Sequence, residues 1–198
     1  MIGNYIKAVA TAVSRSTAQL MKTGQTTSYR TGDDGDLEAG RNVSFTVLAE
    51  NNVFGNTNRF TDELGGQTYT KNIVIDWSTY NGSTVLGWRR TRSSSNWTSA
   101  IDGALIVSIA PFTSGWRLPN VQELFSIQFF GGSGKLNYAP FTTAAGFDLW
   151  TSTTNPAQTN QSFNLSSSTN NLFIASSQLS VFQYIPCRTF TVTGTTLS

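Results

Sequence analysis

The sequence predicts an α+β domain in which two helices pack on a twisted, mainly antiparallel sheet, with loops gathered on one side and a helical extension at the N-terminus. Three observations lead to this class. Residues 97–105 repeat apolar side chains at helical spacing, a second helix start follows Pro119, and short apolar or alternating segments typical of strands precede and follow both helices. Residues 2–20 carry a further helical pattern.

The N-terminal pattern predicts one amphipathic helix over residues 2 to about 20. Ile2, Ile6, Val9 and Val13 recur at helical spacing, and the alanines between them favour helix. The apolar stripe needs a cover, which is either the rest of the chain or a second chain. We therefore expect a homo-oligomer or assembly contact at these four residues, with residues 1–40 as an attachment segment and 41–198 as the domain.

Turn-forming residues dominate the connector from Lys22 to Gly40, and Gly32–Asp36 is predicted to be a turn. Its carboxylates do not match the calcium-loop template, so a solvated turn is favoured over a metal site. Val43, Phe45 and Val47 alternate with polar residues and predict a strand. The apolar run 73–75 predicts a central strand.

Two helices are predicted inside the domain. Trp97, Ala100, Ile101, Ala104 and Leu105 have the spacing of a helix that buries one face. The second helix should run from Val121 to about Gln128, because Pro119 ends the preceding segment and Asn120 with Glu123 forms a capping pair. Strands are expected after it, at 172–175, 182–187 and 190–192, and the long polar segments 131–146 and 155–170 are expected to be loops.

Composition limits the possible functions. The chain has 198 residues, enough for one domain with a short extension; only 12% are charged and the net charge is +2, which argues against a nucleic-acid partner. No apolar run is long enough to span a membrane, and the first residues lack the features of a secretory leader. There is no histidine, so we expect a non-enzymatic protein with no cofactor. Cys187 is the single cysteine, and a buried structural thiol is favoured over a nucleophile.

Several segments, taken in order, resemble one family. The most specific is Gly115-Trp116-Arg117-Leu118-Pro119-Asn120-Val121-Gln122-Glu123-Leu124. It is joined by Arg59-Phe60-Thr61-Asp62, Gly66-Gln67-Thr68-Tyr69-Thr70, Ile73-Val74-Ile75-Asp76-Trp77, Trp97-Thr98-Ser99-Ala100, Trp150-Thr151-Ser152-Thr153-Thr154 and Pro186-Cys187-Arg188-Thr189-Phe190. Over roughly residues 59–192 the chain resembles bacterial and phage domains related to the C-terminal region of the collagen-like adhesin Lcl.

This resemblance implies a C-type-lectin-like fold, which is also similar to that of formylglycine-generating enzymes. The framework residues it implies are Trp77, Trp97, Trp116, Arg117, Pro119, Glu123, Trp150 and Arg188. The tryptophans are expected to pack in the core. The tripeptides that bind calcium and sugar in calcium-dependent lectins do not occur in the sequence, so calcium-mediated sugar binding is not supported. An enzyme of the formylglycine-generating branch is disfavoured by the single cysteine and the missing histidine.

Candidate recognition residues are Arg89, Tyr138, Asn155 and Asn160, because these residue types make adaptable contacts in loops. Arg89 belongs to a basic cluster, Trp88-Arg89-Arg90-Thr91-Arg92, that either contacts an acidic partner or forms a solvated hairpin tip. Both interpretations stay open.

The function expected from these features is a bacteriophage structural protein, a fibre, decoration or tail-associated component that is assembled in the host cytoplasm and displayed on the virion. Its expected partners are copies of itself, other virion proteins and a host-surface glycan or protein. The alternatives are a bacterial surface adhesin module of the same fold, located outside the cell, and a purely architectural capsid or tail component that binds no ligand.

Overall fold

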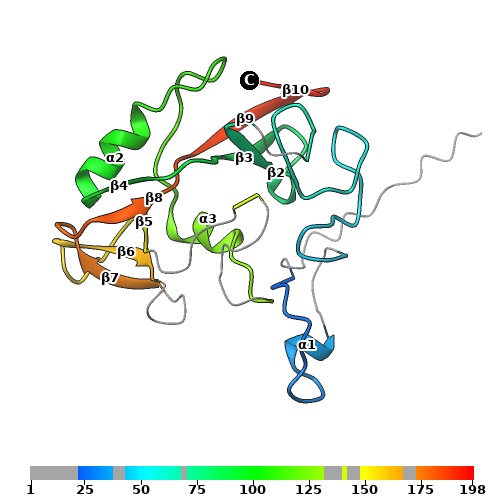
Figure 1. Ribbon diagram of the computed structural model, residues 1–198, viewed down its shortest axis with the longest axis horizontal. Helices are drawn as coiled ribbons and strands as arrows, with labels where there is room; N and C mark the ends of the chain where they lie inside the picture. Colours follow the sequence, from blue (N-terminus) through cyan, green and yellow to red (C-terminus); the bar gives the residue numbers. More distant parts are fainter. Residues whose placement is uncertain (1–21, 38–42, 68–70, 132–139, 142–147, 167–172) are drawn as a thin grey trace, which may run out of the picture.

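A computed structural model describes residues 22–37, 43–67, 71–131, 140–141, 148–166 and 173–198. The predicted helix at 2–20, with Ile2, Ile6, Val9 and Val13, lies outside these residues, as does Tyr138. The described part of the chain is α+β, with two five-stranded sheets that lie side by side (Figure 1).

The first sheet is antiparallel throughout and has the order β1-β2-β3-β9-β10. Its strands are β1 Phe60–Thr61, β2 Ile73–Asp76, β3 Thr84–Arg89, β9 Cys187–Thr193 and β10 Thr196–Leu197. All four residues of β2 are buried, because both faces of this sheet are covered. The predicted central strand at 73–75 is therefore confirmed.

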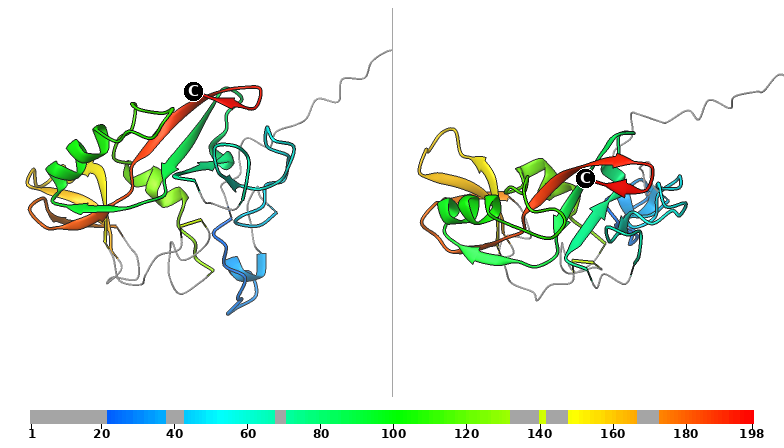
Figure 2. Two further views of the ribbon diagram at one scale, coloured as in Figure 1. Left: turned by 45° about the horizontal axis from the view of Figure 1, so that its top comes forward. Right: turned by 90° about the horizontal axis from the view of Figure 1, so that it is seen from above.

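The second sheet has the order β4-β8-β5-β6-β7. Its strands are β4 Ser93–Ser95, β8 Phe182–Tyr184, β5 Leu149–Thr154, β6 Gln161–Leu165 and β7 Phe173–Ser177. Only the β5–β8 pairing is parallel. The expectation of a mainly antiparallel arrangement is confirmed, but the expectation of a single sheet is wrong, since the strands divide into two groups that Figure 2 shows from two directions.

Two chain segments cross from one sheet to the other. β3 continues into β4, and β8 continues into β9, so the same pair of segments is antiparallel in both sheets. The last pair of the first sheet is Trp88 with Cys187, and the first pair of the second sheet is Ser93 with Tyr184. Between these two pairs, four residues of one segment (89–92) lie opposite two residues of the other (185–186). Pro186 lacks an amide hydrogen, so it contributes only its carbonyl, which accepts from the Arg89 amide at 2.8 Å. The excess residues bulge out here, and the bulge carries Arg89.

Both predicted domain helices are present. Helix α2, Trp97–Leu105, packs on the second sheet, and helix α3, Val121–Ser126, lies near the middle of the molecule (Figure 1). The Asn120 side chain accepts from the Glu123 amide and the Glu123 carboxylate accepts from the Asn120 amide, each at 2.9 Å, which confirms the predicted capping pair. A single-turn 3-10 helix, η1 (Trp77–Thr79), follows β2.

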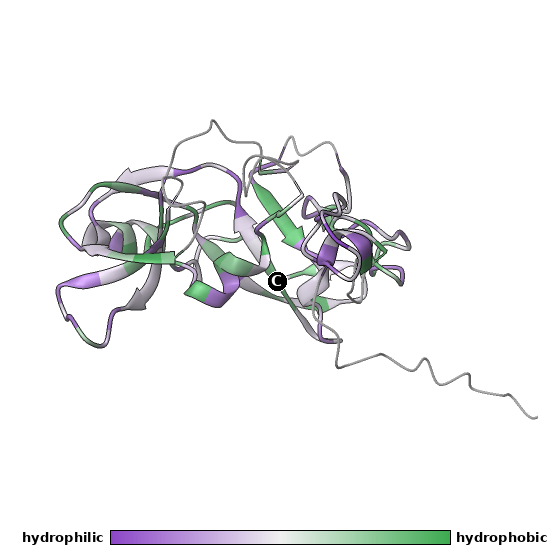
Figure 3. Cartoon of the chain, turned by 90° about the horizontal axis from the view of Figure 1, so that it is seen from below, coloured by the Kyte–Doolittle hydropathy of each residue, from purple (hydrophilic) through white to green (hydrophobic). Residues whose placement is uncertain are grey.

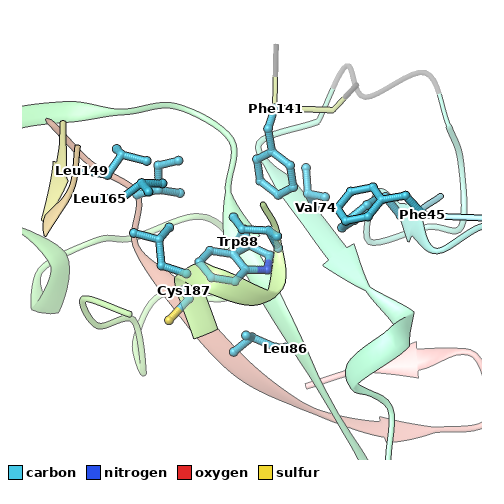
Figure 4. Packing of buried hydrophobic residues seen from close by; sticks show 12 residues of the cluster. Phe45, Val74, Leu86, Trp88, Phe141, Leu149, Leu165 and Cys187 are labelled. Atoms are coloured by element: carbon cyan, nitrogen blue, oxygen red, sulfur yellow. The ribbon is translucent and has the colours of Figure 1, made fainter. Parts of the chain in front are cut away.

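The core forms on both faces of the first sheet. Trp88 and Cys187 point to one face with Leu124 of α3, and Figure 4 shows the Trp88 indole enclosed by apolar side chains. Phe190 lies on the other face, against Trp116 and Phe112 of the segment after α2. In Figure 3 this arrangement appears as a hydrophobic strand in the interior, with hydrophilic residues concentrated in loops and in the short helix α1, Asp34–Leu37.

The four framework tryptophans lie in the interior, as predicted, with Trp97 half-buried and the other three buried. Each indole N–H donates a hydrogen bond: Trp77 to the Thr61 hydroxyl, Trp97 to the Thr151 carbonyl, Trp116 to the Phe112 carbonyl and Trp150 to the Ser95 carbonyl, at 2.8 to 3.1 Å. The bonds of Trp77, Trp97 and Trp150 link segments 16 to 55 residues apart, so these tryptophans fix the relative positions of helices and strands as well as filling the core, whereas the Trp116 bond is local.

Two local predictions are wrong: the segment 155–170 is not one loop, because Gln161–Leu165 form β6, and the segment 43–47 is not a strand. Residues 43–47 do not form a strand: Ser44 and Val47 pair with each other around a tight turn, Val43 is exposed and Phe45 is buried. The alternation placed Val43 and Phe45 on one face, but the turn separates them. The predicted Gly32–Asp36 turn is present as a turn at 31–33 that continues into the one-turn helix α1, where the Asp33 side chain accepts from the Asp36 amide.

A buried ion pair joins the first sheet to α3. Arg59 donates to both carboxylate oxygens of Asp76, at 2.9 and 2.8 Å, and both side chains are fully buried. The guanidinium also donates to the Ser126 carbonyl at 2.7 Å and stacks between the rings of Phe45 and Phe60, 4.5 Å from each centroid. This explains why Phe45 is buried despite lying in a turn.

Candidate functional site

A cavity of about 450 Å³ opens where the two sheets meet, between α2 and the bulged crossing from β3 to β4. Its volume is within the range of small-molecule sites. We call it the Arg89 cavity. Its lining comes from the crossing, from β8 and from the C-terminal end of α2 with the segment that follows: Asn72, Arg89, Thr91, Ser93, Gly103, Ile106, Val107, Ser108, Ile109 and Tyr184.

Arg89 is the charged residue in this lining. Its Nε donates to the Thr91 hydroxyl at 2.8 Å, and Nη1 donates to the Ser93 hydroxyl at 3.4 Å. Within the described ranges, no carboxylate forms an ion pair with Arg89. Two neighbouring hydroxyls thus orient the guanidinium, while most of its five N–H donors are left for water or a ligand.

Tyr184 provides a second polar group. Its side chain is only 6% exposed, yet none of the described residues forms a hydrogen bond with its hydroxyl. The hydroxyl lies against Gly103, where an added Cβ would come within 2.3 Å of it. A glycine in the middle of a helix costs about 1 kcal/mol relative to alanine, so its position here has a packing reason: it leaves room for the Tyr184 hydroxyl.

The cavity lining carries a positive charge, because Arg89 is the one charged residue among the described residues that form it. Lys71 and Arg90, the sequence neighbours of two lining residues, are exposed, and Asp102, next to Gly103, is the exposed acidic group on the α2 side. None of the described residues that line the cavity carries a carboxylate. The cavity therefore favours an anionic ligand.

Of the other members of the predicted basic cluster, Thr91 lines the cavity and the rest do not, and the cluster lies in the crossing from β3 to β4 rather than at a solvated hairpin tip. Trp88 is fully buried in β3. Arg92 donates to Gln183 Oε1 at 3.2 Å and to the Phe141 carbonyl at 3.4 Å. Burial lowers the pKa of Arg92 to about 10, which still leaves it cationic at neutral pH. Strand alternation in β3 separates Arg89 from Trp88, and Arg92 lies beyond the end of β3, just before the start of β4. A cluster in the sequence reveals neither.

The other predicted recognition residues do not join Arg89. Asn155 and Asn160 lie in the turn between β5 and β6 of the second sheet, and neither lines the Arg89 cavity. Asn155 uses its side chain within the turn: it donates to Gln161 Oε1 at 3.2 Å and accepts from the Ala157 amide at 3.0 Å. Asn160 is exposed, and its carbonyl accepts from the Gln178 amide.

A smaller cavity of about 260 Å³ lies where the connector meets the domain, between Gly24, Phe45 and Phe129. The Phe130 amide donates to the Thr23 carbonyl at 2.8 Å, and the Thr23 hydroxyl bonds to Asp34. These contacts attach residues 22–37 to the segment after α3. The exposed surface of this cavity is mainly apolar, although Lys22 and Asp34 are among its lining residues.

Cys187 does not provide a nucleophile. The side chain is fully buried in β9, and burial raises the pKa of the Cys187 thiol to about 12. In the part of the chain that the structure describes, no group of three metal-ligating side chains converges. The carboxylates of Asp33 and Asp36 accept instead from backbone amides of their own turn.

Two framework arginines have structural partners. Arg117 donates to both oxygens of Glu123, at 2.7 and 2.5 Å, and its backbone pairs with Cys187, which ties the start of α3 to β9. Arg188 stacks over Phe190 and Phe112, with its Cζ 4.7 and 5.2 Å from the ring centroids, and burial lowers the pKa of this arginine. Pro119 is buried just before the helix and accepts from the Ser152 amide.

The comparisons with known proteins do not assign the chain to a family. No protein-family model matches the chain, and no curated protein matches its sequence. No helix among the described residues is long and apolar enough to cross a membrane.

Sequence reasoning selected Arg89 but missed the residues that complete its cavity. Tyr184, Asn72 and Ile106 come from three separate segments, so no local pattern joins them. The one available signal was Gly103, because an isolated glycine inside a helical pattern indicates a close neighbour.

Proposed function

We propose that the chain is a non-enzymatic structural protein of a bacteriophage virion, which presents a C-type-lectin-like domain and binds a host-surface glycan or protein at the Arg89 cavity. The observation that carries the binding part of the proposal is the cavity itself. It combines an arginine without a carboxylate partner and a buried tyrosine whose hydroxyl lacks a partner among the described residues. Polar groups that a protein leaves without partners in a recess are available to a ligand.

The virion part of the proposal is supported by the sequence resemblance and by the roles of the residues that carry it. Trp116, Arg117 and Glu123 connect α3 to the first sheet, and Arg59 connects that sheet to the end of α3. The resemblance therefore includes residues that determine the architecture of the described domain. A lectin-like domain of this kind presents loops from a rigid scaffold, which suits recognition by contact.

Mass spectrometry of purified phage particles, compared with host cell-surface and culture fractions, tests the location. We expect the chain in the particles in a constant ratio to the other virion proteins. Detection only in the cell-surface or culture fractions would reject the virion location and favour an adhesin.

Binding is tested with the purified full chain on intact host cells. We expect saturable binding that Arg89→Gln weakens, with Arg30→Gln as a matched control because Arg30 is exposed in the connector, away from the cavity. A chain that is present in particles but shows no binding to host cells would favour the architectural role.

A further inference from the structure

We infer that the Arg89 cavity recognises a carboxylate-bearing sugar unit, such as a hexuronic acid residue of a surface polysaccharide. This inference rests on the binding function proposed above and specifies its ligand. Three properties of the lining support it: a fixed guanidinium, hydroxyl and amide groups around it, and an apolar wall on one side.

The guanidinium determines that the ligand is an anion and favours a planar one. Thr91 and Ser93 bond to Nε and Nη1 of Arg89, so the fork is held in one orientation before a ligand arrives. The remaining donors of the fork fit the two oxygens of a carboxylate, which bind such a fork in bidentate fashion.

The neutral polar groups favour a ligand with several hydroxyls. The Tyr184 hydroxyl both donates and accepts, and the Asn72 amide and Ser108 hydroxyl offer further donors and acceptors within the same lining. A sugar ring carries hydroxyls on neighbouring carbons, so one small ligand can satisfy groups that come from different elements. In an acidic peptide the carboxylate sits on one or two methylene groups, with no hydroxyl on the neighbouring carbons. Such a side chain would leave the Tyr184, Asn72 and Ser108 groups unsatisfied.

The apolar wall completes the match. Ile106 is 81% exposed at the end of α2, and Val107 and Ile109 continue the same side of the cavity. A sugar ring has C–H groups on its faces, which pack against such a wall while the hydroxyls at the ring edge bond to polar groups. Exposed isoleucine beside an unpaired arginine has no evident structural role in the described fold.

The experiment uses the ¹⁵N-labelled full chain and two probes that differ at one position: methyl glucuronide, which carries a carboxylate, and methyl glucoside, which carries a hydroxymethyl group. Titrations followed by NMR are expected to show saturable shifts at Arg89 and Tyr184 with methyl glucuronide and binding at least tenfold weaker with methyl glucoside, the ratio that an ionic hydrogen bond supplies. Arg89→Gln should remove this preference. Tyr184→Phe should weaken both sugars severalfold and leave the preference in place.

Arg30→Gln is the matched control, since it removes the same charge far from the lining; it should change neither affinity by more than about twofold. Unchanged thermal unfolding of each variant shows that the fold is retained. Inorganic phosphate and N-acetylglutamate amide complete the set, and both should bind more weakly than methyl glucuronide.

Three results would overturn the inference: no shifts with methyl glucuronide, equal binding of the two sugars, or binding of phosphate or N-acetylglutamate amide as tight as that of methyl glucuronide. The last result would identify a general anion or acidic-peptide site. None of these outcomes bears on detection in phage particles or on binding to whole host cells, so a failure of the ligand assignment is distinguishable from a failure of the proposed function.

Discussion

Replacing Asp76 by Asn should destabilise the chain more than any other isosteric acid-to-amide change in the described residues. The substitution keeps the shape of the side chain but removes its charge, so the fully buried guanidinium of Arg59 loses the carboxylate that pairs with it. The bonds from Arg59 to the carbonyls of Phe45 and Ser126 remain, but they do not replace the ionic bond to Asp76. Breaking one partner of a buried pair costs about 3–5 kcal/mol.

Urea unfolding followed by tryptophan fluorescence measures this loss, and the dependence on urea should stay unchanged if only stability is affected. For a chain of this size each kcal/mol lowers Tm by about 2–4 °C, so we expect a decrease of roughly 6–20 °C. Glu123→Gln is the matched control: it makes the same chemical change in the Arg117 pair, which is partly exposed, and should cost less than about 1 kcal/mol.

Arg59→Met combined with Asp76→Asn separates the charge from the packing. Arg59→Met alone leaves a buried carboxylate without its partner, so both single variants should be strongly destabilised. The double variant should lose clearly less than the sum of the two single losses, because it has no unpaired charge. The reasoning is refuted if Asp76→Asn costs no more than Glu123→Gln or if the two substitutions are additive.

Four further predictions follow from the structure. Because its pKa is raised to about 12 by burial, the Cys187 thiol should resist alkylation by iodoacetamide at neutral pH in the folded chain and react in urea; rapid native labelling would contradict this. Asn120→Ala should cost about 1 kcal/mol by removing the cap of α3, and Asn120→Ser should restore most of it in chemical denaturation. Burial opposes ionisation of Glu123, but the bonds from Arg117 and the Asn120 amide outweigh it and lower the pKa of Glu123. Glu123 should therefore stabilise the fold fully above pH 4.5, its ordinary pKa, and this stabilisation should be lost as the pH falls through the lowered pKa of the folded state. Glu123→Gln should accordingly flatten the acid side of a stability–pH profile; parallel profiles would refute this. Gly103→Ala should lower Tm despite its better helix propensity, because the new Cβ would lie 2.3 Å from the Tyr184 hydroxyl, and the loss should shrink or reverse in Tyr184→Phe; an equal loss in both backgrounds would show that the contact is not responsible.

Local chemistry explains which features were predictable. The start of α3 was foreseen because Pro119, Asn120 and Glu123 act within one turn of backbone. Helical spacing is also local, and it correctly placed Ala100 and Ala104 on the buried face of α2, but Leu105, predicted on the same face, is exposed. β2 was recognised because a strand with both faces covered is apolar throughout. The prediction failed at Val43–Val47, where alternation suggested a strand but a turn places Phe45 under the guanidinium of Arg59.

The sequence by itself determined the two domain helices, the strands β2, β7, β8 and part of β9, and the buried tryptophans, since these depend on spacing, capping and side-chain size over a few residues. Only the tertiary structure decided that the strands form two sheets, that Arg59 pairs with Asp76, and that Arg89 shares a cavity with Tyr184 and Gly103. Those features join segments up to about a hundred residues apart. Which distant groups meet depends on how the strands pair and cross, and strand pairing leaves no periodic signal in the sequence.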